Sequence, residues 1–148
     1  MIALGSDQAA FGLKQEVMKH LDELGLAYKD FGSYDEAPCD YPIYGKAVAR
    51  AVVSGECDRG IIMCGTGIGI SMAANKVKGA RAALCSDCFS AEATRLHNDA
   101  NILALGARVI GVGLALKIVD TFLNTEFSGA ERHARRIGLL EEDGDYAE

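Results

Sequence analysis

The chain alternates between short runs of apolar residues and longer segments in which apolar residues recur at every third or fourth position. Short apolar runs are typical of buried strands, and the longer spacing is typical of amphipathic helices. Five strands are predicted in this way, at residues 2–5, 26–31, 60–63, 80–84 and 102–105. Because helical segments separate the strands, we expect an α/β fold with a mostly parallel five-stranded sheet and helices on both faces.

The helices are marked by their apolar spacing and by capping residues at their ends. They are predicted at 10–24, at 42–54, from 70 onward, between the Ser86-Asp87 cap and residues 97–99, and at 113–123. A last helix, at about 129–142, precedes an acidic tail and has only a narrow apolar side around Leu139. This helix needs a partner surface, from the same chain or from another copy, and our interpretation favours a partner subunit.

The stretch at 60–74, GIIMCGTGIGISMAA, joins a predicted strand to a predicted helix through a loop with glycine at 65, 67 and 69. The loop lacks the Lys-Ser/Thr pair of a phosphate-binding P-loop. It also lacks the third glycine of a dinucleotide fingerprint, because residue 70 is Ile. Two interpretations remain: an anion hole built from backbone N–H groups, or a tight turn beside an inert, buried cysteine.

Cys64 stands at the start of this loop. The N-terminus of a helix stabilises a nearby thiolate, which can act as a base or a nucleophile. Polar residues follow other strands too: Asp7 follows the first, and Ser86 and Asp87 follow the fourth. Ligands of open α/β sheets bind beyond the carboxyl ends of the strands, so the pattern predicts a pocket at that edge.

Composition narrows the class of protein. The 148 residues are 49% apolar and carry a net charge of −6, which predicts one domain (1–148) that binds neither nucleic acid nor a membrane. No apolar stretch has the length of a membrane helix, and we expect no export signal. Five cysteines without the spacing of a metal site predict reduced thiols, a cytoplasmic protein and no bound metal. Cys85 and Cys88 form a C-x-x-C, but no second pair or histidine cluster accompanies it.

Six motifs extend over nearly the whole chain: GSDQAAFGLK at 5–14, DYP at 40–42, CGTGIGIS at 64–71, AANK at 73–76, RLHNDAN at 95–101 and GARVIG at 106–111. In this order and spacing they resemble ribose-5-phosphate isomerase type B and its relatives, such as galactose-6-phosphate isomerase. The resemblance implies a Rossmann-like three-layer sandwich and an aldose–ketose isomerase that works through an enediolate, without metal or nucleotide. It also implies a homodimer with pockets shared between chains, and leaves open whether dimers pair into tetramers.

The resemblance also implies the catalytic residues. Cys64 matches the base that moves a proton between C1 and C2 of the sugar. His97 matches the group that assists opening of the sugar ring. The anion hole that holds the enediolate matches the loop after Cys64, namely Gly65, Thr66, Gly67, Ile68 and Gly69.

Further matches imply the groups that bind the substrate. Asp7 and Asn98 match residues that position sugar oxygens, and Asp40 and Tyr41 match one side of the pocket. The positions that match the phosphate clamp are Arg132 and Arg136, four residues apart on one helical face, together with Arg108. Position 8 departs from the family, which usually has histidine there, whereas this chain has Gln8. That change bears on substrate preference more than on reaction type.

Some of these residues also have simpler explanations. His97 could simply be a histidine at the end of a helix, where it interacts favourably with the C-terminal end of the helix dipole. Asp40 could be a plain helix cap before Pro42. Arg132 and Arg136 could belong to a solvated charged face that pairs with acidic neighbours.

The sequence therefore predicts an isomerase of a phosphorylated sugar, with ribose 5-phosphate and ribulose 5-phosphate as the first pair and no cofactor. Three alternatives remain open. One is isomerisation of a hexose 6-phosphate, such as galactose or allose 6-phosphate, on the same site. The others are a non-catalytic sugar-phosphate-binding protein and a nucleotide-dependent oxidoreductase.

Overall fold

The computed structural model describes residues 1–142; the acidic tail noted above continues beyond them, outside the described residues. Its centre is a five-stranded sheet in which every pair of neighbours is parallel, in the order β2-β1-β3-β5-β4. The strands are β1 (Ile2–Ser6), β2 (Tyr28–Asp30), β3 (Arg59–Cys64), β4 (Ala82–Leu84) and β5 (Ile102–Gly106). The α/β class is confirmed, and the sheet is wholly parallel where the sequence predicted a mostly parallel one.

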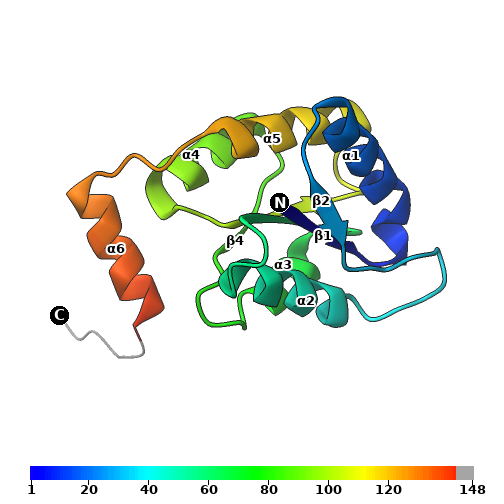
Figure 1. The fold of residues 1–148 in the computed structure, drawn as a ribbon, viewed down its shortest axis with the longest axis horizontal. Helices are drawn as coiled ribbons and strands as arrows, with labels where there is room; N and C mark the ends of the chain where they lie inside the picture. Colours follow the sequence, from blue (N-terminus) through cyan, green and yellow to red (C-terminus); the bar gives the residue numbers. More distant parts are fainter. Residues whose placement is uncertain (143–148) are drawn as a thin grey trace.

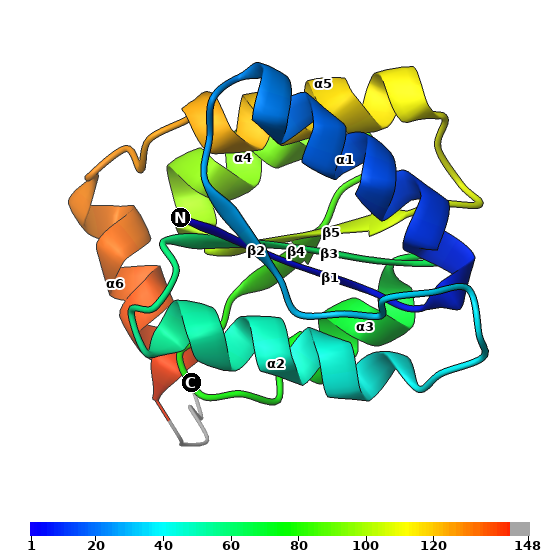
Figure 2. The ribbon, with the colours of Figure 1, turned by 45° about the vertical axis from the view of Figure 1, so that its right-hand side comes forward.

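Helices cover both faces of the sheet, as Figure 2 shows. Three pack on one face: α1 (Phe11–Glu23), α4 (Cys88–Asn98) and α5 (Val112–Asn124). Two pack on the other: α2 (Tyr41–Val53) and α3 (Ile68–Ala74). The result is the three-layer, doubly wound sandwich expected of a Rossmann-like fold.

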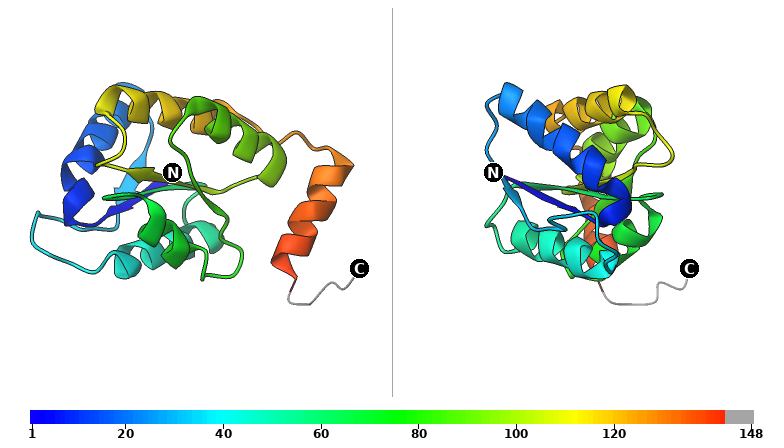
Figure 3. Two further views of the ribbon diagram at one scale, coloured as in Figure 1. Left: turned by 180° about the vertical axis from the view of Figure 1, so that it is seen from behind. Right: turned by 90° about the vertical axis from the view of Figure 1, so that its right-hand side faces the viewer.

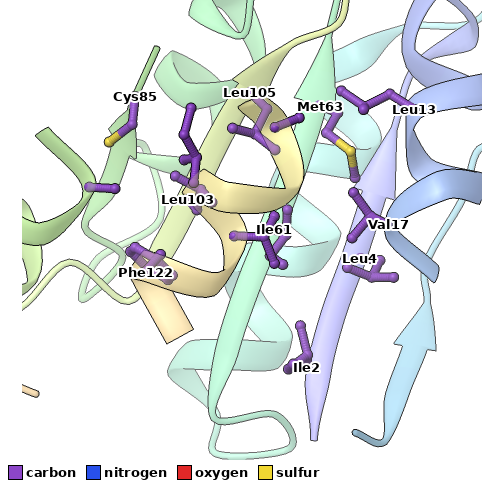
Figure 4. Packing of buried hydrophobic residues seen from close by; sticks show 14 of the residues in the cluster. Ile2, Leu4, Leu13, Val17, Ile61, Met63, Cys85, Leu103, Leu105 and Phe122 are labelled. Atoms are coloured by element: carbon purple, nitrogen blue, oxygen red, sulfur yellow. The ribbon is translucent and has the colours of Figure 1, made fainter. Parts of the chain in front are cut away.

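The two cores follow from alternation along the buried strands. Ile61 and Met63 of β3 face α1 and α5, whereas Ile62 faces α2 and α3. Both sets are fully buried because each sheet face is covered by helices, which explains why the strand reads as a continuous apolar run. Figure 4 shows Leu13 of α1 and Phe122 of α5 closing the first of these cores.

The last helix, α6 (Glu131–Glu141), stands apart from the sandwich, beyond the end of α4 (Figures 1 and 3). Its one buried residue is His133, whose Nδ1 lies 2.9 Å from the Ser128 hydroxyl. Near its other end, the guanidinium of Arg81 donates to Glu141 at 2.8 Å. The helix is thus held at two points, while Leu139 and Leu140 stay exposed.

The predicted bounds agree with the structure except at the sheet edges and the helix starts. The edge strands β2 and β4 have three residues each, shorter than the runs at 26–31 and 80–84, because an edge strand pairs on one side only. A short 3-10 helix at Gln8–Ala10 precedes α1. The helix predicted from 70 starts at Ile68, inside the glycine loop.

Within residues 1–142, no helix combines the length and the apolar character needed to cross a lipid bilayer. Over the same residues, no three side chains of His, Cys, Asp or Glu gather in a way that could hold a metal ion.

Candidate active site

The order of the strands reverses between β1 and β3, and in open α/β sheets a crevice forms at the carboxyl ends of the strands at such a point. The chain leaves β1 toward β2 on one side, and later strands add on the other side of β1. Such switch points are where open α/β sheets bind ligands. Asp7 follows β1 and its N–H donates to the Met63 carbonyl at 3.2 Å, so Asp7 lies beside the end of β3, where Cys64 stands.

Cys64 is 5% exposed, and its sulfur accepts a hydrogen bond from the N–H of Gly67 at 3.1 Å. The loop therefore directs a backbone donor at this sulfur. The helix that follows has seven residues, so its dipole is small and the nearby amide supplies the direct contact. The N–H groups of Gly65 and Thr66 donate to no acceptor within residues 1–142, which leaves two amides of this loop available to an anion.

The glycines keep this loop close to the sheet. Gly67 has a φ of +79°, and a Cβ there would lie 2.5 Å from Leu84 and 2.9 Å from the carbonyl carbon of Leu105. A Cβ on Gly106 would lie 2.5 Å from the Thr66 carbonyl oxygen. The loop therefore rests directly on the end of β5, and Gly106 is a supporting residue that we did not predict as part of the site.

Thr66 and Arg108 lie at this edge too. The Thr66 hydroxyl accepts from the N–H of Ile68 at 3.2 Å, which ties the loop to the start of α3. The N–H of Arg108 donates to the Gly65 carbonyl at 2.9 Å, and a Cβ on Gly65 would meet the Arg108 side chain at 3.5 Å. The structure thus places a cationic side chain beside the loop that starts at Cys64.

Asp7 and Gln8 form the side of the crevice next to β1. Asp7 is 8% exposed and caps the short 3-10 helix by accepting from the N–H of Ala10 at 3.2 Å. The Gln8 side-chain oxygen accepts from both the N–H and the thiol of Cys39, at 3.2 and 3.3 Å. Because a backbone N–H can only donate, this contact also fixes which end of the Gln8 amide faces Cys39.

Asp40 and Tyr41 approach from the start of α2. Asp40 occupies the capping position, yet its side chain makes no capping hydrogen bond and stays exposed, so the plain-cap explanation fails. The Tyr41 ring lies against Gly69, where a Cβ would fall 2.7 Å from Cζ of the ring. The DYP motif and the glycine loop are therefore in contact.

The remaining predicted residues lie at the other end of the sheet. α4 starts after the carboxyl end of β4 and finishes before the amino end of β5. His97 and Asn98 therefore lie where the amino ends of the strands meet, which we call the amino edge, opposite the carboxyl edge that carries Cys64. Arg81, which precedes β4, donates to the Asn98 carbonyl at 3.2 Å. With about 3.3 Å per residue, the length of β5 separates the two edges by about 15 Å. Within one chain, His97 and Asn98 are not brought to Cys64.

Arg132 and Arg136 join His97 in this second group, at α6. The rings of His97 and His133 lie 4.6 Å apart. Burial lowers the pKa of His133, and the positive charges of Arg132, His97 and Arg136 lower it further. Both arginines are exposed, and neither forms an ion pair with another residue of 1–142, so pairing with Glu131 does not account for them.

The amino edge also holds a hollow of about 680 Å³, lined by Asn98, Arg81 and Glu141 among others. It is not at the Cys64 crevice.

The C-x-x-C pair noted in the sequence consists of Cys85 and Cys88. Cys85 is buried, which raises the pKa of its thiol to about 11 and argues against a reactive role.

These features define a class: an α/β protein with a thiol and an amide-lined loop at the switch point of a parallel sheet. Residues 2–140 match the family model of the ribose/galactose isomerases. The chain is 48% identical to ribose-5-phosphate isomerase B of Escherichia coli over 139 residues, 94% of this chain and 93% of that protein. It is 40% identical to galactose-6-phosphate isomerase subunit LacB of Clostridium acetobutylicum, over 96% of this chain and 82% of the relative.

The solved structure of ribose-5-phosphate isomerase B from Clostridium thermocellum superposes with a TM-score of 0.93. It is 54% identical, and the match covers 95% of this chain and 94% of that one. The chain belongs to the ribose/galactose isomerase family, and it is an enzyme of the isomerase class.

Proposed function

We propose that this enzyme interconverts ribose 5-phosphate and ribulose 5-phosphate, with Cys64 as the base. The observation that carries the proposal is the contact between Cys64 and the Gly67 N–H, in a loop with two further N–H groups free. An aldose–ketose isomerase must remove a proton next to a carbonyl and hold the oxyanion that forms. A thiolate beside unpaired amides meets both needs.

The proton movements balance within the substrate. The Cys64 thiolate takes the proton from C2 of the open-chain aldose, and the electron pair moves toward the C1 carbonyl to give an enediolate. The amides of the loop stabilise the negative oxygen. Transfer of the O2 proton to O1 and return of the carbon-bound proton from Cys64 to C1 give the ketose, and leave the thiolate as it began.

A second copy of the chain completes each pocket. Support for this comes from the separation of the two groups, with Cys64 at the carboxyl edge and His97, Arg132 and Arg136 at the amino edge. A C2 dimer can place the amino-edge group of one subunit against the carboxyl-edge crevice of the other. In that arrangement His97 opens the sugar ring, Asn98 holds a sugar hydroxyl, and the two arginines bind the phosphate with Arg108 of the first chain.

The carboxyl-edge side chains supply the remaining contacts. Asp7 and Asp40 accept from sugar hydroxyls, and Gln8 and Tyr41 line the walls on either side of the loop. The identity to the Escherichia coli enzyme favours the pentose pair. The likeness to subunit LacB keeps a hexose 6-phosphate, galactose or allose 6-phosphate, as the second candidate.

We also place the enzyme in the cytoplasm, as a single domain and without cofactor or metal. Its five cysteines are all free, which suits a reducing compartment. The test of the proposal is a panel of ribose, galactose and allose phosphates, scored for isomerisation by the appearance of the ketose. The highest kcat/KM on ribose 5-phosphate would support it, and turnover of none of these sugars would refute it.

A further inference from the structure

Lys14 of α1 is a lysine with 0% exposure in the middle of the fold. Its ammonium group donates to the Asp30 carboxylate at 2.8 Å and to the Ser33 carbonyl. The rings of Phe11 and Tyr34 flank it, with their centroids 5.6 and 5.7 Å from the nitrogen. None of the catalytic steps proposed above uses this residue.

Stability alone does not explain a charge at this position. Removing an ammonium group and a carboxylate from water is costly, and replacing a buried ion pair with apolar residues is often neutral or stabilising. A methionine would fill nearly the same space near the rings of Phe11 and Tyr34 without that cost. What a methionine could not do is hold the Ser33 carbonyl in one place.

The peptide held by Lys14 is joined to the substrate crevice. Ser33 donates its N–H to the Ser6 carbonyl at 2.8 Å, and Ser6 donates to the Gly32 carbonyl at 2.7 Å. Ser6 is the last residue of β1, directly before Asp7. The root of the loop between β2 and α2 is therefore locked to the strand end that carries Asp7 and Gln8.

The other end of the same loop also lies beside the crevice. Cys39 donates its N–H and its thiol to the Gln8 side chain, and Asp40 and Tyr41 follow at the start of α2. Figure 2 shows the loop running from the end of β2, past the start of α1, to α2. Its 31–40 segment is held by Lys14 at the start and by Gln8 near the end, where the loop meets α2. We take this segment as one side of the crevice and call it the 31–40 wall.

The geometry points to Lys14 as a positioning residue for substrate binding, which acts through the 31–40 wall without touching the sugar. This inference rests on the proposed function, because the wall matters only if the crevice binds a sugar phosphate. Cys64 and its loop are held by Gly106 and Ala107 on the opposite side. Loss of the Lys14 contacts should therefore weaken ligand binding far more than it slows proton transfer.

The test compares Lys14→Met with Lys19→Met, the same change at an exposed position of the same helix. Ribitol 5-phosphate, which has no carbonyl and cannot be isomerised, is titrated by calorimetry. KM and kcat are measured separately on ribose 5-phosphate. The double variant Lys14→Met/Asp30→Asn leaves no unpaired buried charge and keeps an acceptor for the Gly32 N–H, so it provides a second, better folded form.

We expect Lys14→Met to raise the Kd for ribitol 5-phosphate and the KM by about tenfold, with kcat changed by less than about threefold. Lys19→Met should behave like the parent enzyme. Unchanged Kd and KM in folded Lys14→Met, or in the double variant, would overturn the inference, as would a loss confined to kcat. If neither Lys14 variant folds, the residue serves the fold itself and the inference is wrong. Should the parent enzyme isomerise none of the sugars, the proposed function fails while the ribitol 5-phosphate titration still reports on Lys14.

Discussion

The backbone N–H of Gly67 donates to the sulfur of Cys64 at 3.1 Å, across the turn that joins β3 to α3. The contact exists because Gly67 adopts a positive φ and has no Cβ to collide with Leu84 and β5. Gly67, the residue directly before α3, thus supplies the N–H that contacts the sulfur, and the N–H groups of Gly65 and Thr66 have no acceptor within residues 1–142.

Replacing Cys64 with alanine should lower kcat by about a hundredfold or more, which is the usual effect of losing a general base. Binding of ribitol 5-phosphate should change little, because the thiol is not a main ligand contact. Cys57→Ala, at a buried cysteine before β3, is the matched control and should keep its turnover. Near-normal kcat in the Cys64 variant would rule out the assignment.

His97→Asn should separate ring opening from isomerisation. Ribose 5-phosphate closes into a ring, whereas erythrose 4-phosphate cannot, because its O4 carries the phosphate. If His97 serves the ring, the variant should lose at least about tenfold in kcat/KM on the pentose and much less on the tetrose. Equal losses on both sugars would point to a structural role at the end of α4.

Mixed dimers should regain activity from two inactive parents. Cys64→Ala removes the base, and the double variant Arg132→Ala/Arg136→Ala removes the proposed phosphate clamp. In a hybrid dimer, one of the two pockets combines the intact Cys64 of the arginine variant with the intact arginines of the Cys64 variant. This pocket has all its groups, whereas the other pocket lacks both the base and the clamp. Equal mixing after reversible dissociation should therefore restore about one quarter of the parent activity.

The hybrids need a control for formation. Differently tagged chains, isolated over two affinity steps, show that hybrids are present. Pure hybrids without activity would mean that the arginines and the base do not meet across a subunit boundary.

Gln8→His should change the affinity for substrate and its pH dependence, with kcat on the best sugar within about tenfold of the parent. A histidine with an ordinary pKa of about 6.5 gains a positive charge as the pH falls, and this strengthens its attraction for phosphate. KM of the variant relative to the parent should therefore fall between pH 8 and 6. Measuring both enzymes over this range cancels the titration of the phosphate itself. A collapse of kcat on every sugar would place position 8 in the catalytic machinery.

Acid should loosen the packing around His133. Its pKa is lowered in the folded protein by burial and by Arg132, His97 and Arg136, so the folded state favours the neutral ring. The stability contributed by that neutral ring is present above the ordinary value of about 6.5, and is lost as the pH falls below it toward the folded pKa. Thermal unfolding from pH 8 to 5 should show a steeper decline for the parent than for His133→Asn. Parallel curves would contradict this.

The sequence by itself predicted the central strands, and it placed the Cys64 thiol and the glycine loop at the end of one of them. Residues 60–63 form a continuous apolar run because β3 is buried on both faces. The strand can therefore be predicted from residues that are adjacent in the chain. The edge strands were predicted too long, because pairing on one side depends on the position in the sheet. Cys64 and the glycines after it are local in the chain, and they could be read together.

Only the tertiary structure decided which distant residues meet. His97 follows Cys64 by 33 positions, and nothing in the spacing shows that the course of α4 carries it to the opposite edge of the sheet. The role of Gly106 is visible only in the structure, where the Thr66 backbone of another loop packs so closely that a Cβ on residue 106 would collide with it. From the sequence, Lys14 would be taken for a solvent-facing lysine of an amphipathic helix, whereas the structure shows it buried in an ion pair with Asp30. Local spacing determines which elements form because it sets which side chains share a face, whereas the packing of whole elements determines which faces and ends come together.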